Sequence, residues 1–245
     1  MQGYENTSTN KDELTMVIMG LQKTTLLDYP HTLAATVFLG GCDFICPYCH
    51  NSELIFHPKA KYSKEEILEF LNKRQNILDG VCITGGEPTL SPDLIDFIKD
   101  IKKLPYKVKL DTNGNNPSTL KYLVENSLID YVAMDLKTTL SNYPNYFINH
   151  KDSADKIEES IQFLLSNAIN YEFRTTITKE LHPLSDLCEM TELIKDAPFY
   201  YLQNFRNVNN VVDSKLNPYS DKELDNIIEV LKKINPRIAR RGDYI

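Results

Sequence analysis

Residues 36–51, TVFLGGCDFICPYCHN, join an apolar run to three closely spaced cysteines. The apolar half, residues 36–39, has the composition of a buried strand that feeds a loop. Cys42, Cys46 and Cys49 follow on that loop at the spacing C-x3-C-x2-C. Three thiolates can hold three irons of a cubane cluster and leave the fourth iron open to a ligand that is not protein. The stretch therefore predicts a strand whose carboxyl end carries a reactive iron–sulfur centre.

Two other interpretations of the three cysteines remain open at this point. Zinc would take four protein ligands, with His50, Cys82 or Cys188 as the fourth, and the thiols could also be a chance cluster of buried side chains. Disulfides are less favoured, because five cysteines are an odd number and the sequence has no mark of a secreted chain. The choice between these interpretations depends on the sequence that follows.

The composition is that of an ordinary globular protein. The 245 residues are 42% hydrophobic and 25% charged, which suits one domain with a substantial core. We assign residues 1–15 to a polar, loose N-terminal leader and residues 16–245 to a single core domain. The sequence contains neither a signal-peptide pattern nor a run of about 18 apolar residues, so we expect a cytoplasmic protein without a membrane partner. A net charge of −7 gives no general reason to bind nucleic acid.

Strand-like and helix-like segments alternate along the chain. The expected strands are residues 33–39, 81–84, 106–110, 130–134, 171–177 and 199–202, and the expected helices begin near Ser63, Ser91, Thr119, Asp155, Leu184 and Ser220. No helix is expected between the cysteines and Ser63. Six such units call for a parallel sheet with helices outside it, and they are too few for a closed eight-unit barrel. We therefore expect an α/β fold, a partial (β/α)6 barrel, with a doubly wound sheet as the alternative.

Polar and glycine-rich clusters follow four consecutive expected strands. The clusters are the three cysteines, Gly85-Gly86-Glu87, Asp111-Thr112-Asn113-Gly114 and Asp135-Leu136-Lys137. The carboxyl ends of parallel strands meet at one edge of a sheet, which is where α/β proteins build their sites. We therefore expect the four clusters to face a common site.

The clusters offer groups for a ligand with several kinds of polar atom. The two glycines would let the backbone approach a ligand and the glutamate after them would accept an ammonium group, although Gly-Gly-Glu-Pro is as often a simple turn before a helix. Asp111 and Asp135 could take hydroxyls or a cation, while Lys137 or Arg174 could pair with a carboxylate. An aminoacyl nucleoside that also binds iron matches this set of groups.

These residues resemble the motifs of the radical S-adenosylmethionine (SAM) enzymes: the cysteine spacing, Tyr48 before the last cysteine, and Gly85-Gly86-Glu87-Pro88. A wider set is similar to the glycyl-radical-enzyme activases, and most of all to the anaerobic ribonucleoside-triphosphate reductase activating proteins. That set comprises Leu26-Leu27-Asp28-Tyr29-Pro30, Phe38-Leu39-Gly40-Gly41-Cys42, Cys46-Pro47-Tyr48-Cys49-His50-Asn51, Asp111-Thr112-Asn113-Gly114 and Asp135-Leu136-Lys137. The resemblance covers about residues 21–206 and implies a partial barrel of the radical SAM type.

The resemblance implies a role for each cluster. Cys42, Cys46 and Cys49 would ligate one 4Fe–4S cluster whose open iron takes the amino and carboxylate groups of SAM. The other expected cofactor-binding residues are Tyr48 and His50 beside the adenine, Gly85, Gly86 and Glu87 at the methionyl ammonium, and Asp135, Lys137 and Arg174 at the ribose and carboxylate. Asp111 and Thr112, with Asn113 next to them, resemble positions that in pyruvate formate-lyase activases help to build a monovalent-cation site.

The implied activity is that of an oxidoreductase whose cofactors carry the difficult step, with no side chain as acid or base. SAM would be cleaved reductively to methionine and a 5′-deoxyadenosyl radical, which would abstract a hydrogen from a glycine of a partner enzyme. The expected partners are anaerobic ribonucleoside-triphosphate reductase and a low-potential electron donor such as flavodoxin or ferredoxin. The alternatives are another glycyl-radical enzyme, a small nucleotide or peptide substrate, or, in another class, a zinc-stabilised binding module.

Some residues depart from the activase pattern. A histidine that lies by the adenine in pyruvate formate-lyase activases has no counterpart in residues 201–206, where Gln203 or Phe205 would have to substitute. No cysteine-rich insert lies between the cysteines and Ser63, so further clusters are not expected. Cys82 and Cys188 are interpreted as packing residues. The remaining histidines are interpreted as loop residues rather than ligands; they are His31, His57, His150 and His182.

Overall fold

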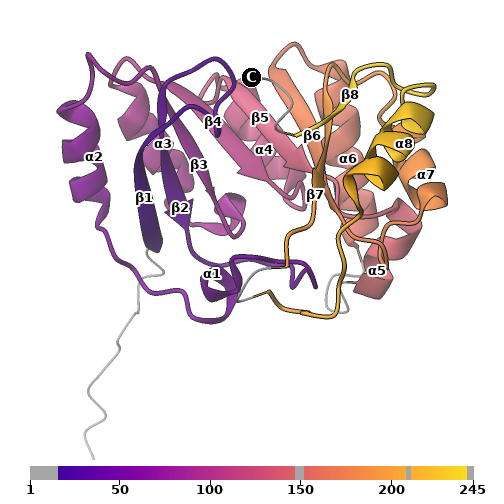
Figure 1. Ribbon diagram of the computed structural model, residues 1–245. Coiled ribbons are helices and arrows are strands. Elements are labelled where there is room, and N and C mark those ends of the chain that lie inside the picture. Colours follow the sequence, from indigo (N-terminus) through magenta and orange to yellow (C-terminus); the bar gives the residue numbers. More distant parts are fainter. Residues whose placement is uncertain (1–15, 147–151, 208–210, 242–245) are drawn as a thin grey trace, which may run out of the picture.

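The computed structural model describes residues 16–146, 152–207 and 211–241, which form an open α/β structure around a single sheet (Figure 1). Its strands are β1 (Ile18–Thr25), β2 (Ala34–Leu39), β3 (Gly80–Gly85), β4 (Lys107–Thr112), β5 (Tyr131–Asp135), β6 (Asn170–Ile177), β7 (Tyr200–Asn204) and β8 (Ile238–Arg240). They hydrogen-bond in sequence order; β2 to β8 are parallel, and β1 pairs antiparallel with β2 at one edge. The expected leader, residues 1–15, lies outside the described residues.

Helices connect the parallel strands and cover one face of the sheet (Figure 1). They are α1 (Ser52–Phe56), α2 (Lys64–Asn72), α3 (Leu94–Lys102), α4 (Pro117–Glu125), α5 (Tyr143–Tyr146), α6 (Ser153–Ser166), α7 (Leu184–Leu193) and α8 (Asp221–Leu231). Strand residues such as Ile83, Leu110 and Met134 are fully buried in one apolar cluster with Phe97 of α3 and Leu120 of α4. Removal of this apolar surface from water holds the helices on the sheet.

The other face of the sheet is concave and carries polar side chains toward the carboxyl ends of the strands. Successive side chains of a strand point to opposite faces. In β4, Val108 and Leu110 therefore join the apolar cluster, while Lys109 and Asp111 lie on the concave face and pair with each other. Because the sheet is parallel, the loops that follow β2, β3, β4 and β5 all emerge at the same edge of this face.

The expected fold class is confirmed. Each strand from β2 to β7 is followed by a helix before the next strand, which gives the six expected strand–helix units in an open sheet. The capping boxes expected at Ser63 and Ser220 are present at the starts of α2 and α8. Among the helices of the described ranges, none combines the length and apolarity that crossing a bilayer requires.

Other sequence predictions were wrong in detail. The two edge strands β1 and β8 were not expected, because β1 is partly exposed and β8 has only three residues. The short helix α1 lies where no helix was expected, since five residues are too few for a periodic apolar pattern. The helix expected from Ser91 begins at Leu94, because Pro92 and Asp93 form a turn before it and Asp93 is its N-cap.

Candidate functional site

The four polar clusters meet at the carboxyl edge of the sheet, as the sequence predicts. Direct hydrogen bonds join the loop after β2 to each of the other three. The Glu87 N–H donates to the Gly41 carbonyl at 2.8 Å, and the Asn113 side-chain amide donates to Asp43 at 2.7 Å. The Tyr48 hydroxyl lies 3.4 Å from the Lys137 carbonyl as a weak donor. The cysteine loop is therefore held from three neighbouring strand ends.

Gly85 and Gly86 are required where the loop after β3 crosses the cysteine loop. Gly85 has a φ of +132°, and a Cβ on it would lie 2.1 Å from the Leu39 carbonyl oxygen. A Cβ on Gly86 would lie 2.0 Å from the Gly41 carbonyl oxygen. Real Cβ atoms do not approach backbone this closely, so any other residue must displace the cysteine loop. These glycines therefore do more than form a turn before a helix, because they allow the two loops to cross.

The Glu87 side chain connects two of the loops. It is buried, and its carboxylate accepts hydrogen bonds from the backbone and hydroxyl of Thr89 at 3.1 and 2.5 Å, from the Thr112 hydroxyl at 2.8 Å and from the Asn113 N–H at 2.6 Å. Burial raises the pKa of Glu87 to about 7, against the lowering effect of these bonds. Thr112 and Asn113 therefore face Glu87, and its oxygens are committed to groups of the protein.

Asp43 is a site residue that the sequence analysis missed. It lies between the first two cysteines, and its two carboxylate oxygens accept from the side-chain amides of Asn113 and Asn115, each at 2.7 Å. This pair of bonds fixes the first half of the cysteine loop to the loop after β4. A lone aspartate next to a cysteine carries no pattern that distinguishes this role from a solvent-exposed side chain.

The three cysteines have the chemistry of an iron–sulfur ligand set. Cys46 is buried and Cys42 and Cys49 are half-buried, and the three thiols are near enough for Cys42 and Cys46, and Cys46 and Cys49, to affect each other electrostatically. Burial raises the pKa of both Cys42 and Cys46, the latter to about 11, so bound metal would have to stabilise their thiolates. The ammonium of Lys137 opposes this rise at Cys46.

The spacing of these ligands also bears on the kind of metal. In the described part of the chain, no three His, Cys, Asp or Glu side chains are close enough together to hold a single metal ion. A zinc ion needs its ligands around one centre, whereas a cubane holds each thiolate on a different iron and keeps them further apart. Three thiols on one loop match the ligand set of a cubane that keeps one iron open.

A chain of alternating charges crosses the concave face beside the cysteines. Arg174 of β6 donates to Asp111 at 3.1 Å and to Asp135 at 2.8 Å. Asp111 also pairs with Lys109, and Asp135 pairs with Lys137 at 3.0 Å. Although burial alone would raise the pKa of each aspartate, the neighbouring cations hold both pKa values below their ordinary range. Three cations and two anions leave an excess of positive charge near the thiols.

His182 lies in the loop before α7, as the sequence suggested, but its side chain is buried. It is 1% exposed, and its ring lies 5.7 Å from the ring of Tyr48. Its Nδ1 accepts from the Thr178 N–H at 3.1 Å, so its Nε2 carries the proton and donates to the Lys137 carbonyl at 2.9 Å. Burial lowers the pKa of His182, which favours this neutral form. His182 thus holds the Lys137 carbonyl, to which the Tyr48 hydroxyl also donates.

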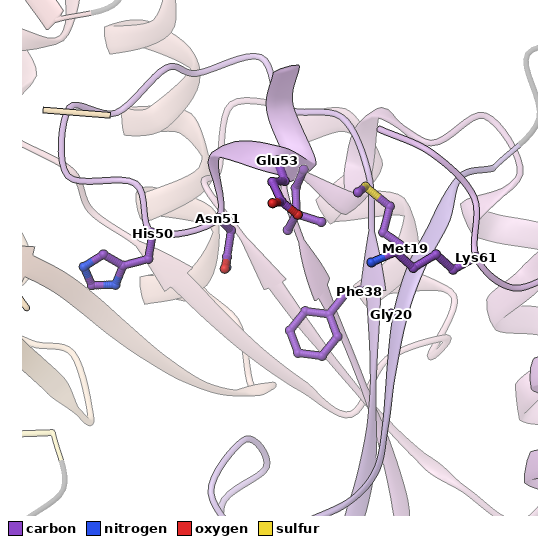
Figure 2. Close-up of a pocket in the computed structure, with 8 residues that line it drawn as sticks. Met19, Gly20, Phe38, His50, Asn51, Glu53 and Lys61 are labelled. Carbon is purple, nitrogen blue, oxygen red and sulfur yellow. The ribbon is translucent and has the colours of Figure 1, made fainter. Parts of the chain in front are cut away.

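His50 faces residues from the far end of the sheet. Its ring lies 5.4 Å from the ring of Phe205, just after β7, and its buried Nε2 has no hydrogen-bond partner among the residues that the structure describes. Gln203 and Phe205 were the two candidates to substitute for the missing histidine. Of these, Phe205 lies beside His50. His50 also borders a cavity of about 290 Å³, and its ring points away from Phe38 and Lys61 on the cavity's other side (Figure 2).

The other cysteines and histidines lie away from the three-cysteine loop. Cys82 is fully buried on β3, where its thiol lies 3.7 Å from an Asp111 oxygen, and Cys188 packs against the core from α7. His31 lies in the turn before β2, and His57 follows α1. The remaining histidine, His150, lies outside the described residues.

Comparison with known proteins gives the same family throughout. Residues 36–197 match the family model described as the Radical SAM superfamily. A Methanocaldococcus jannaschii protein with the provisional name glycyl-radical enzyme activating enzyme is 31% identical over 234 residues, which are 92% of this chain and 95% of the relative. A second protein of that organism, with the same provisional name, is 31% identical over 199 residues, or 77% of this chain and 73% of the relative.

Solved structures with the same fold include one bound to S-adenosylmethionine and a domain of an activating enzyme. Streptococcus suis SuiB bound to S-adenosylmethionine has a TM-score of 0.64 at 19% identity, over 83% of this chain and 48% of SuiB. A domain of the pyruvate-formate lyase-activating enzyme from Bacteroides vulgatus has a TM-score of 0.55 at 18% identity, over 67% of this chain and 99% of that domain. At these identities the likeness establishes the fold.

We expect Gly86→Ala to abolish most iron binding, because the added Cβ displaces the backbone at Gly41 and the cysteine after it. The measurement is iron content after anaerobic reconstitution, with circular dichroism to verify folding. The matched control is Gly20→Ala, whose Cβ would meet only the Phe38 side chain at 3.2 Å and should leave iron content within about a fifth of the wild type. Normal iron content in Gly86→Ala would show that the loop crossing is not needed.

Cys46→Ala should prevent cluster assembly, while Cys82→Ala should leave the iron content nearly unchanged. The two thiols are both buried, but only Cys46 lies on the three-cysteine loop. Iron and sulfide analysis of both variants after the same reconstitution makes the comparison. Equal iron loss in the two variants would contradict the ligand assignment.

His182→Ala should lower the free energy of unfolding by about 1–3 kcal/mol, because it leaves a buried N–H of Thr178 and weakens the support of the Lys137 carbonyl. Urea unfolding monitored by circular dichroism gives the value. His31→Ala, in a turn at the protein surface, is the control and should change it by less than about 0.5 kcal/mol. A similarly small change in the free energy of unfolding of both variants would show that His182 does not support the Lys137 carbonyl.

Proposed function

The chain belongs to the radical SAM superfamily and is a radical SAM enzyme, and on that basis we propose that it activates a glycyl-radical enzyme. The observation that carries the proposal is the similarity to the first Methanocaldococcus jannaschii protein, which runs over 92% of this chain and 95% of that one. A match over so much of both chains is not confined to one part of the fold. The relative's name therefore bears on the reaction and not only on the fold.

The family implies a 4Fe–4S cluster and SAM as cofactors. Cys42, Cys46 and Cys49 would hold the cluster. When bound, the pair supplies an electron for reductive cleavage of SAM and a radical able to remove hydrogen from a glycine Cα. The protein's part is to position the cofactors and to exclude water and oxygen.

Residues around the cysteines are suited to hold the parts of SAM. The proposed contacts are Tyr48 and His50 at the adenine, Gly85 and Gly86 at the methionyl ammonium, and Asp135, Lys137 and Arg174 at the ribose and carboxylate. Two observations support them: His50 has a buried ring nitrogen with no partner in the described part of the chain, and Lys137 lies at the cysteine end of the charge chain. Since the carboxylate of Glu87 already accepts four hydrogen bonds, we assign the ammonium to the backbone of the glycines, with Glu87 as their support.

We further propose anaerobic ribonucleoside-triphosphate reductase as the target and a flavodoxin or ferredoxin as the electron donor. The support is the sequence resemblance, which includes the turn Leu26-Leu27-Asp28-Tyr29-Pro30 in addition to the cofactor motifs. Leu26 and Leu27 are 74% and 75% exposed, and Asp28 accepts from the Thr36 hydroxyl at 2.6 Å. The turn therefore presents two apolar side chains from a fixed base.

We expect the anaerobically reconstituted protein, given dithionite and SAM, to form 5′-deoxyadenosine and to produce a glycyl-radical signal on the reductase. Electron paramagnetic resonance detects the radical and chromatography the nucleoside. Pyruvate formate-lyase, tested in parallel, is the control for target choice, and Cys46→Ala is the control for the cluster.

Each contrary result has a distinct meaning. A radical on pyruvate formate-lyase alone would move the target to another glycyl-radical enzyme. Formation of 5′-deoxyadenosine without a radical on either protein would favour a small nucleotide or peptide substrate. A colourless protein that contains zinc and no iron would establish a binding module instead.

A further inference from the structure

Lys109 places a cation inside the protein at the base of the candidate site. Its side chain is 0% exposed, although it stands on the concave face of β4 rather than in the apolar cluster. The ammonium pairs with Asp111, lies 3.8 Å from the Cys82 sulfur and lies 6.0 Å from the centre of the Tyr131 ring. A carboxylate, a sulfur and an aromatic face thus surround the three N–H groups of this ammonium.

The Asp111 carboxylate is fully engaged by cations of the protein. One oxygen accepts from Lys109 and from the Cys82 thiol, and the other accepts from Arg174 at 3.1 Å. The neighbouring Thr112 hydroxyl donates to Glu87 at 2.8 Å and accepts from the Gly114 N–H at 3.1 Å. The residues expected to build a monovalent-cation site therefore direct their oxygens toward other groups.

A monovalent metal ion does not fit this arrangement. Such an ion needs several oxygen ligands turned toward one point, whereas the side-chain oxygens of Asp111 and Thr112 already bond to groups of the protein. It would also lie beside two cations, Lys109 and Arg174, that already share one carboxylate. Repulsion between like charges is strongest where water is excluded, as it is around Lys109.

We propose that the Lys109 ammonium is a built-in cation that takes the place of a monovalent metal ion at Asp111, so that the site works without sodium or potassium. Lys109 acts through Asp111, whose carboxylate it orients and whose charge it balances, and it is thus a positioning residue. The inference rests on the proposed function only where SAM binding is measured. The stability measurements need neither SAM nor a partner enzyme, so they can fail or succeed independently of it.

The first test uses the reconstituted wild-type protein in sodium, potassium or tetramethylammonium chloride at one ionic strength. The last cation is too large to enter a metal site, so it reports the protein without such an ion. We expect the melting temperature to agree within about 1 °C and the SAM dissociation constant within about twofold across the three salts. A rise of several degrees, or tighter SAM binding by fivefold or more, in sodium or potassium alone would overturn the proposal.

The second test removes the ammonium with Lys109→Ser, which leaves the Asp111 carboxylate and a space beside it. This variant should be less stable than the wild type and should melt about 3 °C higher in sodium or potassium than in tetramethylammonium. Lys102→Ser is the matched control, since it breaks a Lys–Asp pair of 2.9 Å with Asp130 outside the site and should show no cation preference.

A third variant guards against misfolding. If Lys109→Ser does not fold, Lys109→Arg keeps the charge and should fold with the same indifference to cations as the wild type. A melting temperature of Lys109→Arg that is about 3 °C higher in sodium or potassium than in tetramethylammonium would show that the charge of Lys109 is irrelevant, and the proposal would be rejected.

Discussion

The loop after β3 and the cysteine loop approach each other so closely that only backbone fits between them. The Gly86 N–H donates to the Leu39 carbonyl at 2.9 Å, and the next N–H donates to the Gly41 carbonyl. This contact fixes the position of the Glu87 backbone, and the Glu87 side chain in turn holds the loop after β4. Asp43 completes the circuit, because it accepts from that loop and lies among the cysteines. Three loops thus position the thiols, and helix α1 adds a hydrogen bond from the Gly41 N–H to the Leu54 carbonyl at 2.7 Å.

Electrostatic balance imposes a second constraint on the concave face. An isolated ion in a poorly solvated place is unstable by several kcal/mol, so each ion there needs a partner. The alternation from Lys109 through Asp111, Arg174 and Asp135 to Lys137 meets this need with residues from three adjacent strands and the loop after β5. This row of five charged side chains has three cations and two anions, and the cation at its cysteine end is Lys137. Anionic groups, such as thiolates and a carboxylate, are favoured at that end.

The sequence predicted the parallel units because each of their strands contains a run of at least three buried residues. β1 and β8 escaped prediction, because edge strands that are partly exposed or very short lack this signal. The meeting of the four polar clusters was predictable, because the carboxyl ends of parallel strands lie at one edge of the sheet. The burial of Lys109 was not predictable, since Lys107 and Lys109 look alike in sequence, yet Lys107 is exposed and Lys109 is buried among Asp111, Cys82 and Tyr131. His182 was missed because its partner, the Lys137 carbonyl, is 45 residues away.

Counting hydrogen-bond capacity separates ligand-facing residues from supporting ones. Glu87 and Asp111 are of the types expected to bind SAM or a cation, yet both oxygens of each accept from the protein itself. The Lys137 ammonium, by contrast, has three N–H donors, and its bond to Asp135 uses one of them. Asp135 therefore orients this ammonium and leaves it able to bind a carboxylate. Acidic and basic side chains thus support the loops at some positions and face the ligand at others. The number of donors or acceptors that the protein leaves uncommitted distinguishes the two roles.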